Sequence, residues 1–427
     1  MTDAIHSNVE HEASLKVPQR NLEYGRSTLP SSVPIIGLGC SSFSTFFWDS
    51  RERGREGGQW TPQDMDRTHP RVQEWIRTIH CAIECGILLL DTAPWYGHGT
   101  SEVVIGWALE EILGEGSSVA RDDLIINTKV GRYEADPQKQ FDFSKEATLT
   151  SVERSLERMK CQYINVLQLH DPEFAPTLDI IMEETIPAMV ECRDKGKCRA
   201  LGMTGYPLCV QYQILQRSLE THGPSIWDQS LVYGHFNLHD TSLFSRLLAN
   251  NSNGRSFFEF CDNHTMTLMA AAPLSMGLLT KDGPPEWHPA TKALKDACRE
   301  AASICSTYNV DIATLAIIKA LSDPRIPCTL LGMKNVEQVK AAVEVAGRFL
   351  SVDRGTRDPK KILKHILTKD ESKVMEILED PTSGPFAIVL TTGEYQWDGV
   401  QQAIDFWKTV DGVETEAWQF QETNKSD

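Results

Sequence analysis

The stretch GILLLDTAPWYGHGTSE (86–102) begins with an aliphatic run and ends in polar residues and glycines. An uninterrupted apolar run is typical of a strand that is buried on both faces of a parallel sheet covered by helices. Asp91 ends this run, and Tyr96 follows five residues later. In parallel α/β folds the carboxyl ends of the strands carry the chemistry, so this stretch predicts functional side chains at that edge.

Similar apolar, β-branched stretches recur along the chain, and segments with helical periodicity separate them. The predicted strands cover residues 33–39, 87–92, 123–129, 164–170, 199–204, 227–233, 267–273 and 326–332. Eight alternating strand and helix segments favour an α/β fold of the (β/α)8 TIM barrel type, in which a barrel of about 250 residues often carries insertions. A doubly wound open sheet is the alternative.

Three stretches extend beyond a minimal barrel, which we assign to residues 20–350. Residues 1–19 are polar and predict a disordered N-terminal tail. A charged, glycine-containing insertion, 46–70, follows the first strand directly, so we expect it at the carboxyl rim. The third stretch is a C-terminal extension, 351–427.

We expect this C-terminal extension to pack on the barrel, because a segment of its size would make only a marginal core alone. A separate small module or a dimer contact is the alternative. The apolar and aromatic side chains expected to be buried against the barrel are Phe386, Ile388, Tyr395, Trp397, Phe406 and Trp407.

The chain has 427 residues and a formal net charge of -17. Nucleic acids and anionic membranes both require a basic protein surface, so this charge argues against either partner. The 11 cysteines lack metal-ligand spacing, and we interpret them as reduced core residues in a reducing compartment, with no metal site. The N-terminus has no apolar targeting segment, and no apolar run approaches the roughly 18 residues of a membrane span. The sequence predicts a cytoplasmic protein with a small-molecule partner and indicates no particular oligomeric state.

Ionisable side chains end three consecutive predicted strands. Asp91 ends the second strand, with Tyr96 in the loop that follows, and Lys129 and His170 end the third and fourth. A phenol with a pKa of about 10 is a poor acid or base at neutral pH, but a neighbouring ammonium lowers that pKa by favouring the phenolate. The pattern therefore indicates proton transfer by Tyr96 beside Lys129. Asp91 would keep Lys129 charged and fixed, and His170 would hydrogen-bond a substrate oxygen.

These residues resemble the aldo-keto reductase family, whose barrel carries an Asp, a Tyr, a Lys and a His in this order on these strands. The resemblance runs from about Asn21, in what looks like the family's opening hairpin, to about Leu350. It rests on LLLDTAPWYGHGTSE (88–102), IINTKVGRY (125–133), SVERSLERMKCQYINVLQLHDPE (151–173) and GKCRALGMTGYPL (196–208). Within the family the chain looks most like the aldose dehydrogenase branch, with L-galactose dehydrogenase and D-arabinose 1-dehydrogenase, which oxidises aldoses at C1 to lactones. That likeness is carried by APWYGHG (93–99), MTGYPL (203–208) and APLSMGLLT (272–280).

The resemblance implies that Tyr96 transfers the proton, that Lys129 and Asp91 tune it, and that His170 orients the sugar hydroxyl. It also implies NAD as cofactor, with NADP possible, lying across the carboxyl rim with its phosphates near the seventh strand and the last barrel helix. The cofactor-binding residues implied in this way are Gly39, Cys40, Thr204, Tyr233, Ala272, Pro273, Leu274, Gly277, Gly332, Met333, Lys334 and Gln338.

Two features depart from the wider family pattern and recur in the aldose dehydrogenase branch. The Ser-Asn pair after the fifth strand is Thr204-Gly205 here, and the Tyr before the Pro-Leu of the seventh strand is Ala272. Gln338 stands where NADP-dependent relatives commonly place Arg, which leaves Lys334 as the basic group of this segment. We therefore expect NAD to be used at least as well as NADP.

The sequence thus predicts an NAD(P)-dependent oxidoreductase that oxidises an aldose of the L-galactose, L-fucose or D-arabinose type at C1. Alternatives are an NADPH-dependent aldehyde or ketone reductase and a non-catalytic regulatory barrel. An enzyme needs the whole set of Asp91, Tyr96, Lys129 and His170, and the set is complete here, which favours the enzyme.

Overall fold

The computed structural model describes residues 16–22, 29–45, 60–134, 139–245, 254–286, 288–353, 355–393 and 396. Most of the expected N-terminal tail, the first part of the insertion (46–59) and the end of the extension from residue 397 lie outside these described residues.

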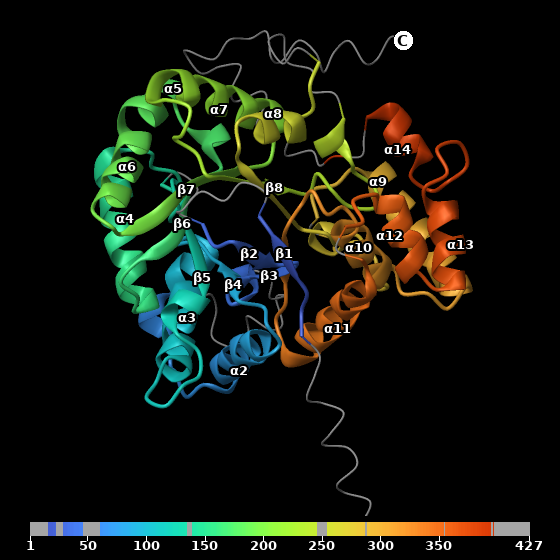
Figure 1. Ribbon diagram of the computed structural model, residues 1–427, viewed down its shortest axis with the longest axis horizontal. Helices are drawn as coiled ribbons and strands as arrows, with labels where there is room; N and C mark the ends of the chain where they lie inside the picture. The colour runs from blue at the N-terminus through green and yellow to red at the C-terminus, as the bar shows by residue number, and fades with distance from the viewer. Residues whose placement is uncertain are drawn as a thin grey trace, which may run out of the picture.

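Eight parallel strands close into a barrel in the order β10-β3-β4-β5-β6-β7-β8-β9 (Figure 1). Each predicted strand segment overlaps one of them, which confirms the (β/α)8 barrel and rules out the open sheet. The barrel strands are β3 (Ile36–Gly39), β4 (Leu89–Asp91), β5 (Ile125–Val130), β6 (Ile164–His170), β7 (Cys198–Gly205), β8 (Gln229–Tyr233), β9 (Thr267–Ala271) and β10 (Thr329–Gly332).

Helices surround this barrel and bury their apolar faces on the outer side of the strands. Several begin at a side-chain cap that the sequence supplies, such as Ser144, whose Oγ accepts the N–H of Ala147 at the start of α4. The helices are α2 (Pro70–Glu84), α3 (Thr100–Ile112), α4 (Lys145–Met159), α5 (Leu178–Ile180), α6 (Ile186–Asp194), α7 (Leu208–His222), α8 (Phe257–Asn263), α9 (Lys292–Thr307), α10 (Ile312–Leu321) and α11 (Val336–Gly347), with a π-helical segment η6 (Ile181–Thr185) between α5 and α6. The short 3-10 turns are η1 (Cys40–Ser42), η2 (Pro62–Asp64), η3 (Tyr96–Gly99), η4 (Arg121–Asp123), η5 (Pro172–Phe174), η7 (Ser242–Phe244), η8 (Ser275–Gly277) and η9 (Arg348–Ser351).

An antiparallel hairpin covers the amino-terminal end of the barrel. It pairs β1 (Gln19–Asn21) with β2 (Ser32–Pro34), directly before β3. Its Arg20 guanidinium donates to three backbone carbonyls between the end of α10 and the start of β10. Val17, within the expected tail, is buried, and its N–H donates to the carbonyl of Cys85. The hairpin therefore closes the end of the barrel that lies opposite the carboxyl rim.

The described part of the insertion leads into α2. Trp60 packs edge-on against Trp75 of α2, with ring centroids 6.1 Å apart. It also contacts His69, the N-cap of α2, at 4.8 Å. This end of the insertion is therefore anchored on the first helix of the barrel.

The C-terminal extension forms α12 (Pro359–Ile366), α13 (Lys369–Leu378) and α14 (Ala387–Thr392), which lie beside α9 and α10 (Figure 1). Its Val374, Leu378 and Phe386 share an apolar core with α9 and α10. Lys319 of α10 pairs with Glu379 at 2.5 Å. The expectation for Ile388 is wrong: on the six-residue α14 the buried face is turned to Val389, and Ile388 is 63% exposed. Tyr395, Trp397, Phe406 and Trp407 lie outside the described residues.

Within the described ranges, no single helix is long and apolar enough to cross a membrane. Among the described helices, only α9 and α10 taken together are long and apolar enough, and the two are bent by 105° relative to each other.

Candidate active site

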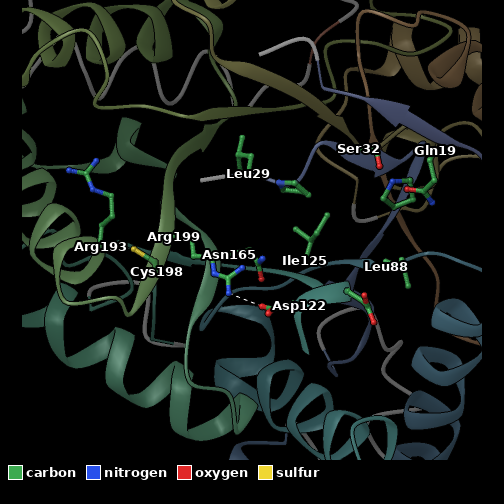
Figure 2. Close-up of a pocket in the computed structure, with 13 residues that line it drawn as sticks. Gln19, Leu29, Ser32, Leu88, Asp122, Ile125, Asn165, Arg193, Cys198 and Arg199 are labelled. Atoms are coloured by element: carbon green, nitrogen blue, oxygen red, sulfur yellow. Dashed lines mark hydrogen bonds and ion pairs between the residues drawn. The ribbon is translucent and has the colours of Figure 1, made fainter. Parts of the chain in front are cut away.

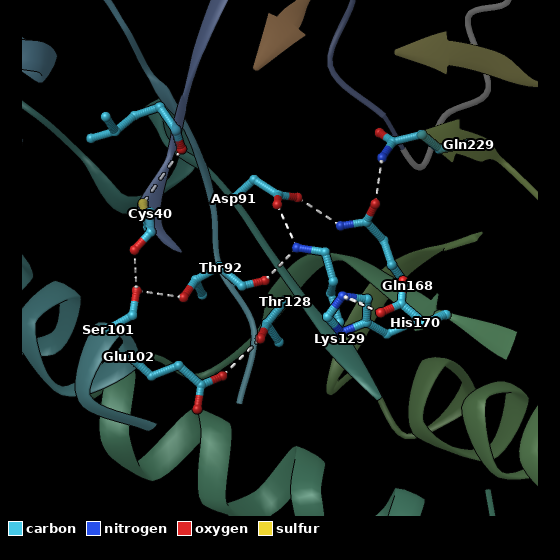
Figure 3. Close-up of polar contacts among 12 residues, drawn as sticks. Cys40, Asp91, Thr92, Ser101, Glu102, Thr128, Lys129, Gln168, His170 and Gln229 are labelled. Carbon is cyan, nitrogen blue, oxygen red and sulfur yellow. Dashed lines mark hydrogen bonds and ion pairs between the residues drawn. The ribbon is translucent and has the colours of Figure 1, made fainter. Parts of the chain in front are cut away.

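Asp91 and Lys129 form a buried ion pair at the carboxyl ends of β4 and β5. Lys129 Nζ lies 2.5 Å from Asp91 Oδ1 and also donates to the carbonyl of Thr92 at 2.8 Å (Figure 3). Both side chains are almost completely buried. Burial alone would lower the pKa of Lys129, but the charges of Asp91 and Tyr96 and the hydrogen bonds to them together outweigh burial and raise that pKa above its usual value. Lys129 is therefore a fixed cation at the rim.

Two glutamines extend this ion pair across the barrel interior. Gln168 Nε2 donates to Asp91 Oδ2 at 2.7 Å, and Gln229 Nε2 donates to Gln168 Oε1 at 3.4 Å (Figure 3). The sequence analysis missed both residues. A signal was present for Gln168, because it stands two residues before His170 on β6 and so points to the same face of the strand.

Tyr96 reaches this pair because the chain turns sharply after β4. Gly97, His98 and Gly99 all adopt left-handed backbone angles in η3, with φ of 62°, 54° and 102°. A Cβ on Gly97 would lie 1.9 Å from Thr100 Oγ1, so only glycine fits there. The turn places Lys129 Nζ 4.7 Å from the centroid of the Tyr96 ring.

The environment shifts the pKa of Tyr96 in two opposing directions. Burial of the phenol is the larger effect and raises its pKa, while the Lys129 ammonium lowers it. Lys129 lowers the pKa of Tyr96, as the sequence predicts. The pKa is nevertheless raised above its usual value, because the pocket that positions the phenol also removes water from it. The phenolate therefore depends on Lys129 and becomes abundant only under alkaline conditions.

His170 completes the group as a neutral imidazole. Its ring meets the Tyr96 ring edge-on, with centroids 6.1 Å apart and an interplanar angle of 89°. Burial lowers the pKa of His170 to about 3; Asp171 opposes this shift, and Lys129 and Arg132 reinforce it. Its Nδ1 has no hydrogen-bond partner among the described residues. The structure thus brings together all four side chains predicted to carry the chemistry.

Arg132 forms one wall beside this group. Its guanidinium donates to Asp171 Oδ2 at 2.7 Å and lies 3.5 Å from the centroid of the Trp95 ring. Asp171 follows His170 directly and adopts a left-handed φ of 47°. Trp95, Arg132 and Asp171 belong to the loops after β4, β5 and β6, so these contacts connect the three loops. The ion pair with Asp171 thereby fixes Arg132 beside Trp95, the residue next to Tyr96.

Glu173, which the sequence analysis did not single out, is a buried carboxyl group in η5. Its Oε1 accepts the backbone N–H of Tyr206 at 2.9 Å, and its Oε2 has no hydrogen-bond partner in the described part of the chain. Burial, and then the charge of Asp171, raise the pKa of Glu173 to about 8. A Cβ on Gly205 would lie 2.6 Å from Oε2. The carboxyl group thus occupies the space that a larger residue at position 205 would need.

The residues expected to border the nicotinamide end strands on the same rim. Gly39 of β3 pairs with Gly332 of β10, and Thr204 of β7 pairs with His170 of β6. Tyr233 ends β8 and is half-buried. Cys40 is buried behind Gly39, where burial and then the charge of Asp91 raise the pKa of its thiol. Met333 is buried too, and its carbonyl accepts the Ser42 hydroxyl at 3.0 Å.

The loop after β9, expected to hold the pyrophosphate, has an unusual backbone. We define the 272–277 loop as Ala272, Pro273, Leu274, Ser275, Met276 and Gly277. Ala272, Ser275 and Met276 have positive φ, between 47° and 59°, and Gly277 has a φ of 96°. Left-handed backbone is uncommon for residues other than glycine, and it is found at functional sites where neighbouring structure enforces it.

The segment expected around the adenosine begins α11. Asn335 caps this helix by accepting the N–H of Gln338 at 2.9 Å. Lys334 and Gln338 are both exposed, and Gln338 Oε1 accepts the backbone N–H of Lys334 at 2.9 Å. A helix N-terminus with an adjacent lysine attracts anions, which fits a phosphate group.

A pocket of about 580 Å³ lies away from this rim, at the opposite end of the barrel (Figure 2). It is lined by the β1–β2 hairpin and by the amino-terminal ends of β5, β6 and β7, including Ile125, Asn165 and Arg199. Arg199 is bound there to Asp122 at 2.7 Å. Within the described ranges, no group of three or more His, Cys, Asp or Glu side chains is arranged to hold a metal ion.

The chain is similar to several known proteins. The model of the aldo/keto reductase family matches residues 57–354. L-galactose dehydrogenase of Arabidopsis thaliana is 37% identical over 268 residues, which cover 63% of this chain and 76% of that protein. D-arabinose 1-dehydrogenase of Saccharomyces cerevisiae is 32% identical over 272 residues, covering 62% and 74%. The holo form of an aldo-keto reductase from Bacillus halodurans has the same fold, with a TM-score of 0.56 at 23% identity over 82% of this chain and 97% of that one.

Proposed function

This chain belongs to the aldo/keto reductase family and is an NAD(P)-dependent oxidoreductase, and from that premise we propose that it oxidises an aldose at C1 to the lactone. The observation that carries the proposal is the convergence of Tyr96, Lys129 and His170 on one rim. The named aldose dehydrogenases at 37% and 32% identity support a sugar as substrate, of the L-galactose, L-fucose or D-arabinose type.

In this proposal Tyr96 is the acid–base group. Its phenolate accepts the proton of the C1 hydroxyl, while the C1–H bond breaks and its electron pair leaves with the hydrogen. When bound, the nicotinamide cofactor accepts that hydride. Lys129 stabilises the phenolate, Asp91 holds Lys129, and the neutral His170 orients the C1 oxygen. Because burial raises the pKa of Tyr96, oxidation should accelerate as the pH rises.

The carboxyl rim also offers features that suit a dinucleotide. We assign Gly39, Cys40, Thr204 and Tyr233 to the nicotinamide end and the 272–277 loop to the pyrophosphate. The adenosine would lie by Gly332, Met333, Lys334 and Gln338 at the start of α11. The helix N-terminus and the exposed Lys334 support an anion there, and the uncharged Gln338 supports NAD over NADP.

We also place the protein in the cytoplasm. All 11 cysteines lie in the described part of the chain and are free, which supports a reducing compartment.

The decisive experiment offers the purified full chain L-galactose, L-fucose, D-arabinose and simple aldehydes. Each is tested with NAD and NADP and, for the aldehydes, with NADH and NADPH, following nicotinamide absorbance. We expect at least one aldose to reduce NAD, with the lactone as product. Turnover confined to aldehyde reduction by NADPH would support the reductase alternative instead, and no turnover with any substrate would support a non-catalytic barrel.

A further inference from the structure

In the described part of the C-terminal extension, the side chain of Phe386 contacts a loop of the carboxyl rim. This residue is buried, and the centroid of its ring lies 6.1 Å from that of His239. His239 belongs to the loop after β8, and its neighbour Leu238 packs in the same apolar core as Phe386 and Val389. The extension therefore contacts a rim loop as well as the outer helices.

His239 in turn holds the 272–277 loop. Its Nε2 lies 2.7 Å from the hydroxyl of Ser275, and both side chains are buried. A second histidine, His288, lies 3.0 Å from the carbonyl of Ser275 through its own Nε2. The Nδ1 of His288 accepts the N–H of Ala290 at 3.0 Å, so its Nε2 carries the proton and donates to Ser275. Two histidines thus fix the hydroxyl and the carbonyl of one serine.

Such support has a physical reason. Ser275 and Met276 are consecutive non-glycine residues in left-handed conformation, which is unfavourable without external contacts. The loop would relax if the bond to His239 were lost. Its backbone would then be less well organised for any ligand on the rim.

The extension is built to deliver Phe386 to this place. After α13 the chain turns at Gly384, whose N–H donates to the carbonyl of Asp380 at 3.0 Å. A Cβ on Gly384 would lie 2.6 Å from that carbonyl oxygen and 2.7 Å from that of Ile377. Glycine therefore allows the tight turn that directs Phe386 inward against His239.

We propose that the C-terminal extension, through Phe386 and His239, fixes the 272–277 loop and so sets the affinity for the nicotinamide cofactor. His239 is a positioning residue, because it acts through Ser275. This inference rests on the proposed function, which assigns the 272–277 loop to the cofactor pyrophosphate.

The test uses the full chain and four variants: Phe386→Ala, His239→Ala, the double variant of these two, and Val374→Ala. Val374 is a buried extension residue on α13 in the same core, so it is the matched control for lost packing. NAD binding is titrated by tryptophan fluorescence, and thermal unfolding, kcat and the sugar KM are measured alongside. We expect the dissociation constant for NAD to rise about tenfold in Phe386→Ala and in His239→Ala, with the sugar KM and the kcat at saturating NAD within about twofold.

The double variant should bind NAD no more weakly than His239→Ala, because both changes break one chain of contacts. His239→Gln should recover part of the affinity through its amide, and Phe386→Leu replaces Phe386→Ala if the latter does not fold. Val374→Ala should lower the melting temperature and leave NAD affinity within about twofold.

The inference is wrong if both single variants bind NAD as tightly as the wild type, or if Val374→Ala weakens NAD binding as much as they do. In either case the proposed function still stands if the wild-type enzyme oxidises a sugar. A wild-type chain that binds neither NAD nor NADP overturns both.

Discussion

The two halves of the carboxyl rim are organised in different ways. At β4, β5 and β6 the polar side chains stand on regular strands or on one tight turn. An ion pair of 2.5 Å and a hydrogen bond from a glutamine connect Asp91, Lys129 and Gln168 inside the barrel. At β8 and β9 the rim consists of irregular loops, in which two histidines hold Ser275 and the C-terminal extension supports one of them.

This difference follows from what each half has to do. Proton and hydride transfer need atoms held to a fraction of an ångström, which a buried ion pair on rigid strands provides. Binding an extended cofactor needs backbone shaped around phosphates, and loops provide that shape. We therefore expect substitutions in the first half to change turnover and those in the second half to change affinity.

The largest effect should come from Tyr96→Phe. The ring and its contact with Lys129 remain, but the group that accepts the proton is lost. Turnover should fall by at least roughly 100-fold, which is typical for loss of an acid–base group, and the NAD dissociation constant should stay within about twofold. Steady-state kinetics and fluorescence titration measure the two quantities. A variant with near wild-type turnover would remove Tyr96 from the mechanism.

This first half is also the part that the sequence could predict. Asp91, Lys129 and His170 each end an apolar run, and the two-residue period of a strand tells which side chains share a face. Tyr96 was found because it lies in the loop that directly follows the strand ending in Asp91. The barrel itself followed from eight repeats of the same pattern.

The second half gives no such periodic signal. His239, Ser275 and His288 are far apart along irregular loops, and their contacts depend on where the chain returns in space. The inward direction of Phe386 and the outward direction of Ile388 depend on the turn at Gly384, which the composition of the extension does not reveal. Glu173 was missed for a similar reason, because its burial depends on the missing side chain at Gly205.

The next effect in size concerns Lys129→Met. The ammonium lowers the pKa of Tyr96, so its loss leaves burial unopposed and raises that pKa further. The pH at which oxidation becomes fast should rise by about one unit or more, which means about tenfold less activity at neutral pH. The measurement is kcat/KM for the sugar from pH 6 to 10.

Removing Lys129 also leaves Asp91 as a buried charge with less compensation. The double variant Asp91→Asn/Lys129→Met removes both charges and is the control for this strain. It should show a smaller upward shift of the pH profile than Lys129→Met, because the charge of Asp91 itself raises the pKa of Tyr96, together with a more stable fold. A profile that stays in place in both variants would remove the proposed role of Lys129.

Glu173 lies between the two halves, and its effect should be on stability. The folded protein keeps the Glu173 proton up to about pH 8, whereas the unfolded chain releases it near pH 4.5. The free energy of unfolding should therefore fall as the pH rises from 4.5 through 8, because the folded state binds the extra proton. Glu173→Gln stays neutral, so its stability relative to wild type should rise by roughly 1–3 kcal/mol between pH 5 and pH 9.

Urea unfolding at the two pH values measures this difference. Glu344→Gln, an exposed change on α11, is the matched control and should show no such trend. If the free energy of unfolding of Glu173→Gln differs from that of the wild type by the same amount at both pH values, Glu173 is ionised in the folded protein. The two halves are then not separated by a neutral carboxyl group.

The smallest effect should come from Gln338→Arg at the start of α11, in the binding half. Gln338 is exposed and stands near Lys334, so an arginine there would add a second cation for the 2'-phosphate of NADP. The exposed position limits the gain through solvent screening, and the bond from Gln338 Oε1 to the Lys334 N–H is lost. We expect the ratio of NADP to NAD affinity to rise about threefold to tenfold, with kcat unchanged.

The control is Ala341→Arg, which adds the same charge about one turn further along the helix. It should shift the ratio less, because the field of the helix N-terminus that favours the phosphate is confined to the first turn of the helix. Equal shifts in both variants would mean that net charge alone attracts NADP and that the start of α11 is not where the adenosine end binds.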